Sequence, residues 1–343
     1  MLRKLNRPRL PRKQRPTWKK SSRLTTPAYP ADLAEAGLRI FLSWFGPHYA
    51  RSVAVDSLES DGDTAVATLT VGRRWSMQAL VANTLGLDAT IGWEAGRAAI
   101  EKRLDAERPG TVLWVPRGAQ PPSAEPGLSE LVLAVEDART LDDGRREMRR
   151  PVTLHLRRVG TTGSVITVLG GLSGHWAQFT NRVPGTFQLN SHELFRLPSA
   201  DEDREAISER IVLAAGQPTI DESQAIPAED CWTVTQLEGG QSCVIGTPSP
   251  DNDEQSSVLR RNLRRLLKRI QGLTPSGEVR ALIVLGAATY ASEEKLSWAL
   301  RGMDPTLYAG FDLVAVIADG VVKTLLLPGR GALPWDAPLP GQA

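Results

Sequence analysis

One stretch of this sequence, Glu254 to Leu327, most strongly constrains the fold. It begins with a segment, Ser256 to Gln271, whose leucines recur at three- and four-residue spacings, as on one face of an α-helix. The most continuous apolar runs of the chain follow, at Val279 to Leu285 and Phe311 to Leu327. This order predicts a helix that packs on a sheet through its apolar face.

The remaining surface of the predicted helix is basic. It carries six cations, Arg260, Arg261, Arg264, Arg265, Lys268 and Arg269. No acidic residue lies between Glu254 and Glu278. Arginine forks match the geometry of phosphates, and helical spacing would let Arg260, Arg264 and Lys268 contact a ligand along one line. The pattern therefore predicts an outward basic face.

The elements around this helix predict a strand-helix-strand-helix-strand unit. A strand pair is expected at Trp232 to Gln236 and Ser242 to Ile245. The basic helix, a strand, a helix at Ser292 to Leu300 and two strands joined at Asp319 and Gly320 follow. Such spacing indicates a crossover with at least partly parallel strands.

Length and local patterns define the predicted organisation. A chain of 343 residues is expected to form roughly two domains. We predict an α+β or mixed α/β fold with four parts: a disordered basic arm at 1–30, a helix-rich domain at 31–150, a sheet-centred domain at 151–330 and a Pro-rich tail at 331–343. The change to a period of two near Pro151 favours that boundary.

The first domain is predicted to begin with an apolar helix from Ala31 to Phe45. A hairpin should follow, Ser52 to Leu58 with Thr64 to Val71. Helices are predicted at Ser76 to Leu85 and Thr90 to Ala106, with Glu94, Arg97, Glu101 and Arg103 facing solvent in the second. In the second domain, Val152 to Arg158 and Ser164 to Leu169 predict another hairpin, and Ile220 to Glu229 a loop.

Charge is distributed unevenly along the chain. Residues 1–31 contribute ten of the 41 basic side chains and none of the 39 acidic ones, so the remainder carries a net charge of −8. Without the six helix cations, that remainder is near −14. Two positive elements thus stand against an acidic body.

The arm is the first of these elements. Prolines and like charges predict that it is disordered alone. Its candidate nucleic-acid-binding residues are Arg7, Arg9, Arg12, Lys13, Arg15, Trp18, Lys19 and Lys20, with Trp18 available to stack on a base. A solubilising tail, a protein-docking arm and an organelle presequence are the alternatives.

A second basic run, Arg145 to Arg150, has a different interpretation. Asp142, Asp143 and Glu147 flank or interrupt it. Internal ion pairing is therefore expected there rather than a nucleic-acid patch.

Motifs for catalysis or cofactor binding are weak. In the segment Gly170 to His175, the order of residues fits neither phosphate-binding motif. A nucleophile elbow would need Gly at position 175, which is His. The histidines and the two cysteines lack metal-ligand spacing. We predict no catalytic residue, metal or cofactor, while Asp312, Asp319 and Glu278 would be the carboxylates of a divergent metal-dependent nuclease.

The order of elements from Trp232 onward resembles the core of restriction-endonuclease-like folds, with a hairpin, a basic helix and a further strand. The acid-x-Lys pair of such enzymes is missing, since Glu238 is followed by glycines and Lys323 has Val321 at the acid position. The resemblance therefore implies an inactive relative that binds nucleic acid.

These observations lead to one functional hypothesis and its rivals. We expect a non-catalytic, nucleic-acid-associated subunit of a bacterial cytosolic complex, binding DNA or RNA. The rival is a scaffold subunit whose basic elements bind acidic protein surfaces, its own or a partner's. No membrane span is expected, and binding to a membrane surface would need the helix's apolar face to be free. The cysteine usage and the absence of an apolar signal segment near Met1 favour the cytosol.

Overall fold

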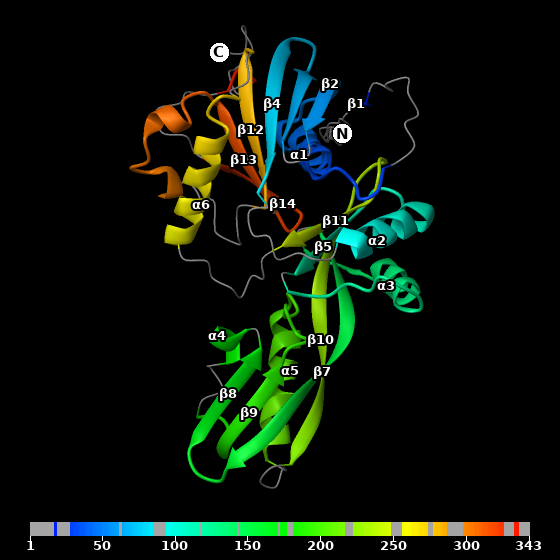
Figure 1. Cartoon of the computed structure of the whole chain (residues 1–343), viewed down its shortest axis with the longest axis vertical. Helices are drawn as coiled ribbons and strands as arrows, with labels where there is room; N and C mark the ends of the chain where they lie inside the picture. The colour runs from blue at the N-terminus through cyan, green and yellow to red at the C-terminus, as the bar shows by residue number, and fades with distance from the viewer. Residues whose placement is uncertain are drawn as a thin grey trace, which may run out of the picture.

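The computed structural model describes residues 28–61, 64–84, 94–116, 118–142, 144–170, 172–176, 181–216, 222–247, 256–273, 277–286, 298–325 and 333–335, together with the backbone of 17 and 18. The fold is mixed α/β and is built on two mixed sheets. Figure 1 shows the first sheet in the upper body and the second continuing into a lower lobe.

The first sheet has the strand order β1-β2-β3-β4-β12-β13-β14. Its strands are β1 Thr17–Trp18, β2 Val53–Asp61, β3 Thr64–Val71, β4 Trp75–Asn83, β12 Val279–Leu285, β13 Leu313–Ala318 and β14 Val321–Leu325. β2, β3 and β4 are antiparallel, β12 is parallel to both β4 and β13, and β14 returns antiparallel to β13. The central strands thus join segments that lie almost 200 residues apart in the sequence.

Helices cover both faces of this sheet. α1, Leu33–Tyr49, packs Phe41 and Phe45 on one face, with its first turn capped by the Asp32 carboxylate. α6, Ser256–Arg269, and the short η3, Pro305–Leu307, pack on the other face. β4, β12 and β13 read as nearly continuous apolar runs because both of their faces are buried.

The second sheet has the order β11-β5-β10-β7-β9-β8, with β6 beside β7. Its strands are β5 Thr111–Pro116, β6 Arg139–Thr140, β7 Arg146–Gly160, β8 Ser164–Gly170, β9 Gly185–Ser191, β10 Ser223–Gln236 and β11 Cys243–Thr247. The long strands β7 and β10 link the two bodies (Figure 1).

The helices of the second sheet divide between its two ends. α2, Glu94–Glu107, and α3, Gly127–Glu136, share a core with β5 and β11 near the first sheet. α5, Asp201–Ala215, and α4, Ser173–Trp176, share another core with β7, β8 and β9 in the lower lobe. The second sheet therefore serves two separate cores along its length.

The sheets do not follow the division predicted at residue 150. β7 crosses that position, and the first sheet takes strands from both sides of it. In the predicted Pro-rich tail, Trp335 is buried against Phe45, with ring centroids 5.4 Å apart.

The sequence predicted the hairpin β2–β3 and the strands β12, β13 and β14 correctly. The helix predicted at Ser76 to Leu85 is wrong, because this segment forms β4. Met77 and the run from Ala79 to Ala82 are fully buried. An apolar run with both faces covered does not alternate, so its periodicity cannot separate strand from helix.

Two other predicted hairpins are each divided by a third strand. β9 lies between β7 and β8, and β5 lies between β10 and β11. The predicted loop at 220–229 is also wrong where β10 begins at Ser223.

Because β10 and β11 belong to the second sheet and do not pair, the hairpin on which the resemblance to restriction endonucleases depended is not formed. In the first sheet, β12 lies between β13 and β4 and is parallel to both.

Arg97 and Glu101 of α2, predicted to face solvent, are buried. The Glu101 carboxylate accepts hydrogen bonds from the backbone N–H groups of Ala31 and Val244, and it pairs with Arg97 at 2.7 Å. The segment before α1 and strand β11 cover this side of the helix, which local spacing could not indicate.

Candidate nucleic-acid interface

α6 forms because one of its faces is apolar and the first sheet supplies a complementary surface. Leu263, Leu266, Leu267 and Ile270 are almost fully buried in a core with Leu282 and its neighbours on the sheet. The predicted docking of this helix is therefore confirmed. Once this face is buried, the six cations on the remaining surface must face solvent or other side chains.

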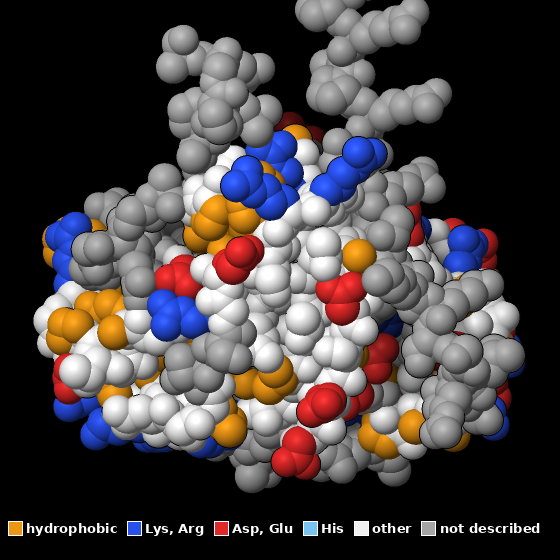
Figure 2. Space-filling model, turned by 90° about the horizontal axis from the view of Figure 1, so that it is seen from above, with side chains coloured by type: hydrophobic (Ala, Val, Ile, Leu, Met, Phe, Trp, Pro, Cys, Tyr) orange, Lys and Arg blue, Asp and Glu red, His pale blue; other side chains and the backbone are white. Residues whose placement is uncertain are grey.

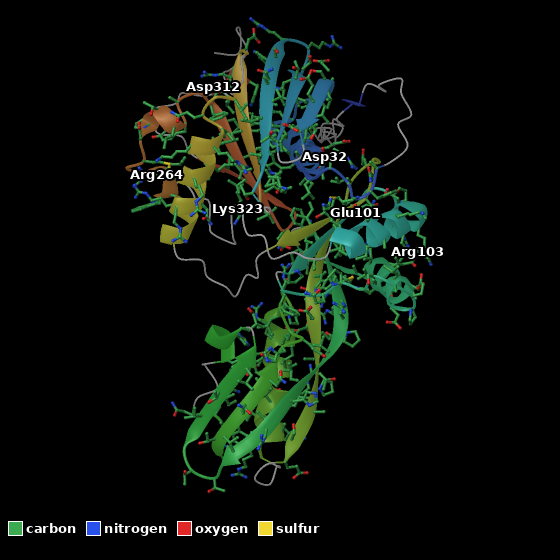
Figure 3. All side chains as sticks on the ribbon, viewed as in Figure 1. Asp32, Glu101, Arg103, Arg264, Asp312 and Lys323 are labelled. Atoms are coloured by element: carbon green, nitrogen blue, oxygen red, sulfur yellow. The ribbon has the colours of Figure 1, made fainter. Side chains whose placement is uncertain are left out.

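All six of these cations are exposed: Arg260, Arg261, Arg264, Arg265, Lys268 and Arg269. We call them the α6 cations. They form two rows with four-residue spacing, one beginning at Arg260 and the other at Arg261. Each row spans about 12 Å along the helix, from the rise of 1.5 Å per residue. Figure 3 shows Arg264 on the outer side of α6, with Glu101 and Arg103 on the opposite side of the molecule.

Two of the α6 cations are tied to neighbouring backbone. Arg260 donates to the Gly302 carbonyl at 2.9 Å, and Arg269 donates to the Asn83 carbonyl at 3.0 Å. Among the residues that the structure describes, no carboxylate lies within ion-pair distance of any α6 cation. Their charge is thus not neutralised by the described part of the body.

The pKa of one carboxylate is influenced by the charge of α6. Asp304 caps η3 by accepting a hydrogen bond from the Thr306 backbone N–H at 3.0 Å. That bond is the main cause that lowers the pKa of Asp304, and the charge of Arg264 lowers it further. The charge of Arg264 thus adds a smaller stabilisation of the ionised Asp304, although the two side chains form no ion pair.

The second basic run, Arg145 to Arg150, forms the predicted internal ion pairs, in contrast to the α6 cations. Arg145 pairs with Asp319 at 2.8 Å, and Arg149 contacts the carboxylates of Glu147, Asp203 and Glu229. Arg150 lies over the Trp232 ring, 4.4 Å from its centroid. These arginines are occupied by acidic or aromatic side chains of the protein, whereas no carboxylate in the described ranges pairs with an α6 cation.

The exposed cations have an energetic cost to the helix. Arg264 faces Arg260 and Lys268 at four-residue spacing, and Arg265 faces Arg261 and Arg269. Each like-charge pair destabilises a helix by roughly 0.2–0.5 kcal/mol, so these four cost about 1–2 kcal/mol in total. A ligand with phosphates would relieve this repulsion.

An aromatic side chain adjoins the cations. Trp298 is 54% exposed, and the Arg301 guanidinium lies 4.4 Å from its ring centroid. The next residues, Ala299 and Leu300, are buried in the same core as α6. Sequence reasoning placed Trp298 in a helix but missed its exposure, because helical spacing alone did not show which side the sheet would cover.

The arm residues cannot be placed in the same way. Arg7, Arg9, Arg12, Lys13, Arg15, Lys19 and Lys20 lie outside the described residues. The backbone of Trp18 belongs to β1, which pairs in parallel with β2 at the edge of the first sheet. This pairing places one point of the arm beside the first sheet.

The three carboxylates considered for a nuclease do not converge. Asp312 and Asp319 flank the two ends of β13, a span of roughly 20 Å at about 3.3 Å per residue. Asp312 is bound by Arg280, and Glu278 accepts from the Ser76 N–H. In the described ranges, no group of three or more His, Cys, Asp or Glu side chains could hold a metal ion.

The wider surface has mixed charge. Seen from above, acidic and basic side chains are interspersed, with many of the basic ones toward the margin (Figure 2). This face therefore carries no field of a single sign. Of the helices in the described ranges, none combines the length and apolar character needed to cross a membrane.

The fold and this surface define a mixed α/β protein with an exposed cationic helix on one face of a sheet. Comparison with protein families, with curated proteins and with solved structures gave no match. The interface is therefore interpreted from its own geometry.

Proposed function

We propose that the protein is a non-catalytic nucleic-acid-binding subunit of a bacterial cytoplasmic complex, and that the α6 cations contact phosphates. The observation that carries this proposal is the exposure of six cations on one helix, without an ion-paired carboxylate among the described residues. A phosphate backbone supplies repeated negative charge along a line, which two rows of cations about 12 Å long can follow.

The basic arm would supply a second phosphate-binding element. Its cations, Arg7 to Lys20, precede α1 in the sequence, and the pairing of β1 with β2 gives the arm a fixed point on the protein. An extended basic chain can follow a phosphate backbone without adopting one conformation.

The proposal is tested by removing charge from α6 without disturbing its backbone contacts. Arg264→Gln/Lys268→Gln leaves the bonds of Arg260 and Arg269 intact. The matched control, Arg139→Gln/Arg182→Gln, removes two exposed cations that pair with acids elsewhere. Affinity for DNA and RNA is measured by fluorescence anisotropy between about 50 and 200 mM salt, where phosphate contacts dominate the salt dependence.

The α6 variant should bind more weakly, and its slope of log affinity against log salt should decrease by roughly 0.7–0.9 for each lost phosphate contact. The control should match the unmodified protein. Absence of binding at low salt, or binding that does not depend on salt, would reject the proposal. A partner that survives nuclease treatment in a pull-down and is lost with the α6 variant would instead identify an acidic protein.

A further inference from the structure

Trp298 has an exposure that packing does not explain. It is the only aromatic residue among the large exposed hydrophobic side chains of the described residues. Trp114, Trp176 and Trp232 are fully buried, and Trp335 is 5% exposed. A tryptophan normally contributes a large buried area. A half-exposed tryptophan next to a cationic helix therefore suggests a ligand-binding role.

The turn that carries Trp298 holds the ring in place. The Arg301 N–H donates to the Trp298 carbonyl at 3.1 Å, and the Met303 N–H donates to the Leu300 carbonyl at 3.0 Å. Leu300 and Met303 are buried against α6. The Arg301 guanidinium stacks over the ring itself. The indole is therefore presented by a packed turn.

This turn meets the first row of α6 cations. Arg260 donates to the carbonyl of Gly302, which lies four residues after Trp298. Arg301, whose guanidinium lies over the Trp298 ring, is the residue directly before Gly302. The exposed ring and its stacked guanidinium thus lie beside the Arg260 end of the row that continues through Arg264 to Lys268.

We propose that Trp298 and Arg301 form a base-stacking subsite, so that the nucleic acid bound along α6 is single-stranded. This inference depends on the proposed function. Cations that follow the backbone, together with an aromatic ring on which a base can stack, are the two elements that single-strand binding combines. In a duplex, each base is already stacked and paired, so the ring would gain little from it.

Single-stranded DNA and RNA share this chemistry, so both are used as probes. Fluorescently labelled strands of identical sequence, and the blunt duplex formed from the DNA strand and its complement, are titrated with the full chain at one low salt concentration. The variants are Trp298→Leu, which keeps an apolar side chain, and Trp298→Phe, which keeps a ring. Leu213→Ala is the control, since Leu213 is a 70% exposed apolar residue on α5.

Unmodified protein should bind the single strands more tightly than the duplex. Trp298→Leu should weaken single-strand binding by roughly 5- to 150-fold, the range expected for one base stack, while duplex binding and the salt slope change little. Trp298→Phe should retain most of the affinity, and Leu213→Ala all of it. A dominant effect on RNA or on DNA would identify the natural strand.

The outcomes separate the two proposals. Binding that is equal for single strands and duplex and indifferent to Trp298→Leu rejects the stacking subsite and leaves the phosphate-binding helix intact. An equal loss on single strands and duplex also rejects it. No binding to any of the three probes rejects the proposed function itself. Because Trp298 is exposed, the thermal midpoint of Trp298→Leu should equal that of the unmodified protein, which excludes misfolding as a cause.

Discussion

Asp319 and Arg196 form a buried bidentate ion pair that joins the two sheets. The Asp319 carboxylate accepts from Nη1 of Arg196 at 2.6 Å and from Nη2 at 2.5 Å. Asp319 lies in the turn between β13 and β14, which reaches the second sheet (Figure 1). The Arg145 guanidinium binds the same carboxylate. The side chains of Asp319 and Arg196 are 1% and 5% exposed, so this pair is isolated from water.

Asp319→Asn should strongly reduce the free energy of unfolding. Asn tolerates the left-handed backbone at this position, where φ is 51°, so the change removes charge with little change of shape. Two arginines would then lack their buried counter-charge, which costs about 3–5 kcal/mol. Urea unfolding measures this loss. Glu136→Gln, at an exposed pair with Arg108, should change stability by less than about 1 kcal/mol, and a similarly small effect of Asp319→Asn would contradict the prediction.

Gly320 should be sensitive to a single added methyl group. Its φ is 75°, and a Cβ there would lie 2.5 Å from Oγ1 of Thr235 on the second sheet. Gly239 has a φ of 74° but open space around its Cα, so Gly239→Ala measures the backbone strain alone, about 1 kcal/mol. Gly320→Ala should cost clearly more in the same urea titration. Equal costs would mean that the turn can move away from β10.

The sequence predicted those elements whose signal is local. Leu263 and Leu267 share a helical face with Leu266 and Ile270, and the turn at Asp319 and Gly320 separates two apolar runs. Each pattern contains its own evidence for a helix or a strand. α6, β13 and β14 therefore agree with the prediction.

The remaining features depend on partners that are distant in the sequence. β5 comes between β10 and β11 from over 100 residues earlier in the chain, and Arg196 meets Asp319 across 123 residues. No spacing rule links such segments, so the hairpin predicted for β10 and β11 failed and the buried ion pair was missed. The exposure of Trp298 also depends on distant segments, because the packing of α6 and the sheet decides which residues are covered.

Both cysteines should be unreactive in the folded protein. Cys231 and Cys243 are fully buried, and burial raises the pKa of both thiols, that of Cys243 to about 12 from an ordinary value near 9. At pH 8 the folded chain therefore contains almost no thiolate. Ellman's reagent should detect no thiol at pH 8 in native buffer and two in guanidinium chloride. A native thiol that reacts at that pH would contradict the burial of these residues.

The same pKa shifts predict the alkaline stability profile. The unfolded chain loses its thiol protons near pH 9, while folded Cys243 keeps its proton up to about pH 12. The contribution of these thiols to stability is complete below pH 9 and is lost as pH rises from 9 towards 12. Tyr29, whose pKa burial raises to about 12 with help from its hydrogen bond to Asp105, acts in the same direction. Urea titrations from pH 8 to 11 should show a falling midpoint, and a midpoint that stays constant or rises would contradict this assignment.

Arg265→Gln should stabilise the protein while weakening nucleic-acid binding. Arg265 lies four residues from both Arg261 and Arg269, so its removal relieves two like-charge contacts and should add about 0.4–1 kcal/mol. Gln and Arg have similar helix propensities, which leaves charge as the main difference. The gain should decrease in 1 M salt, where exposed charges are screened. Urea unfolding at low salt and at 1 M salt measures the gain in stability and its decrease.

Arg103→Gln is the matched control for this change. Arg103 is a half-buried arginine on a helix, and it pairs with Glu107 at 2.7 Å, four residues later. The same substitution there removes a favourable contact and should reduce stability by roughly 0.3–0.5 kcal/mol. Opposite signs at the two positions would show that Arg265 is repelled by its neighbours. A loss of stability at Arg265 would mean instead that an acidic group of the chain already pairs with it.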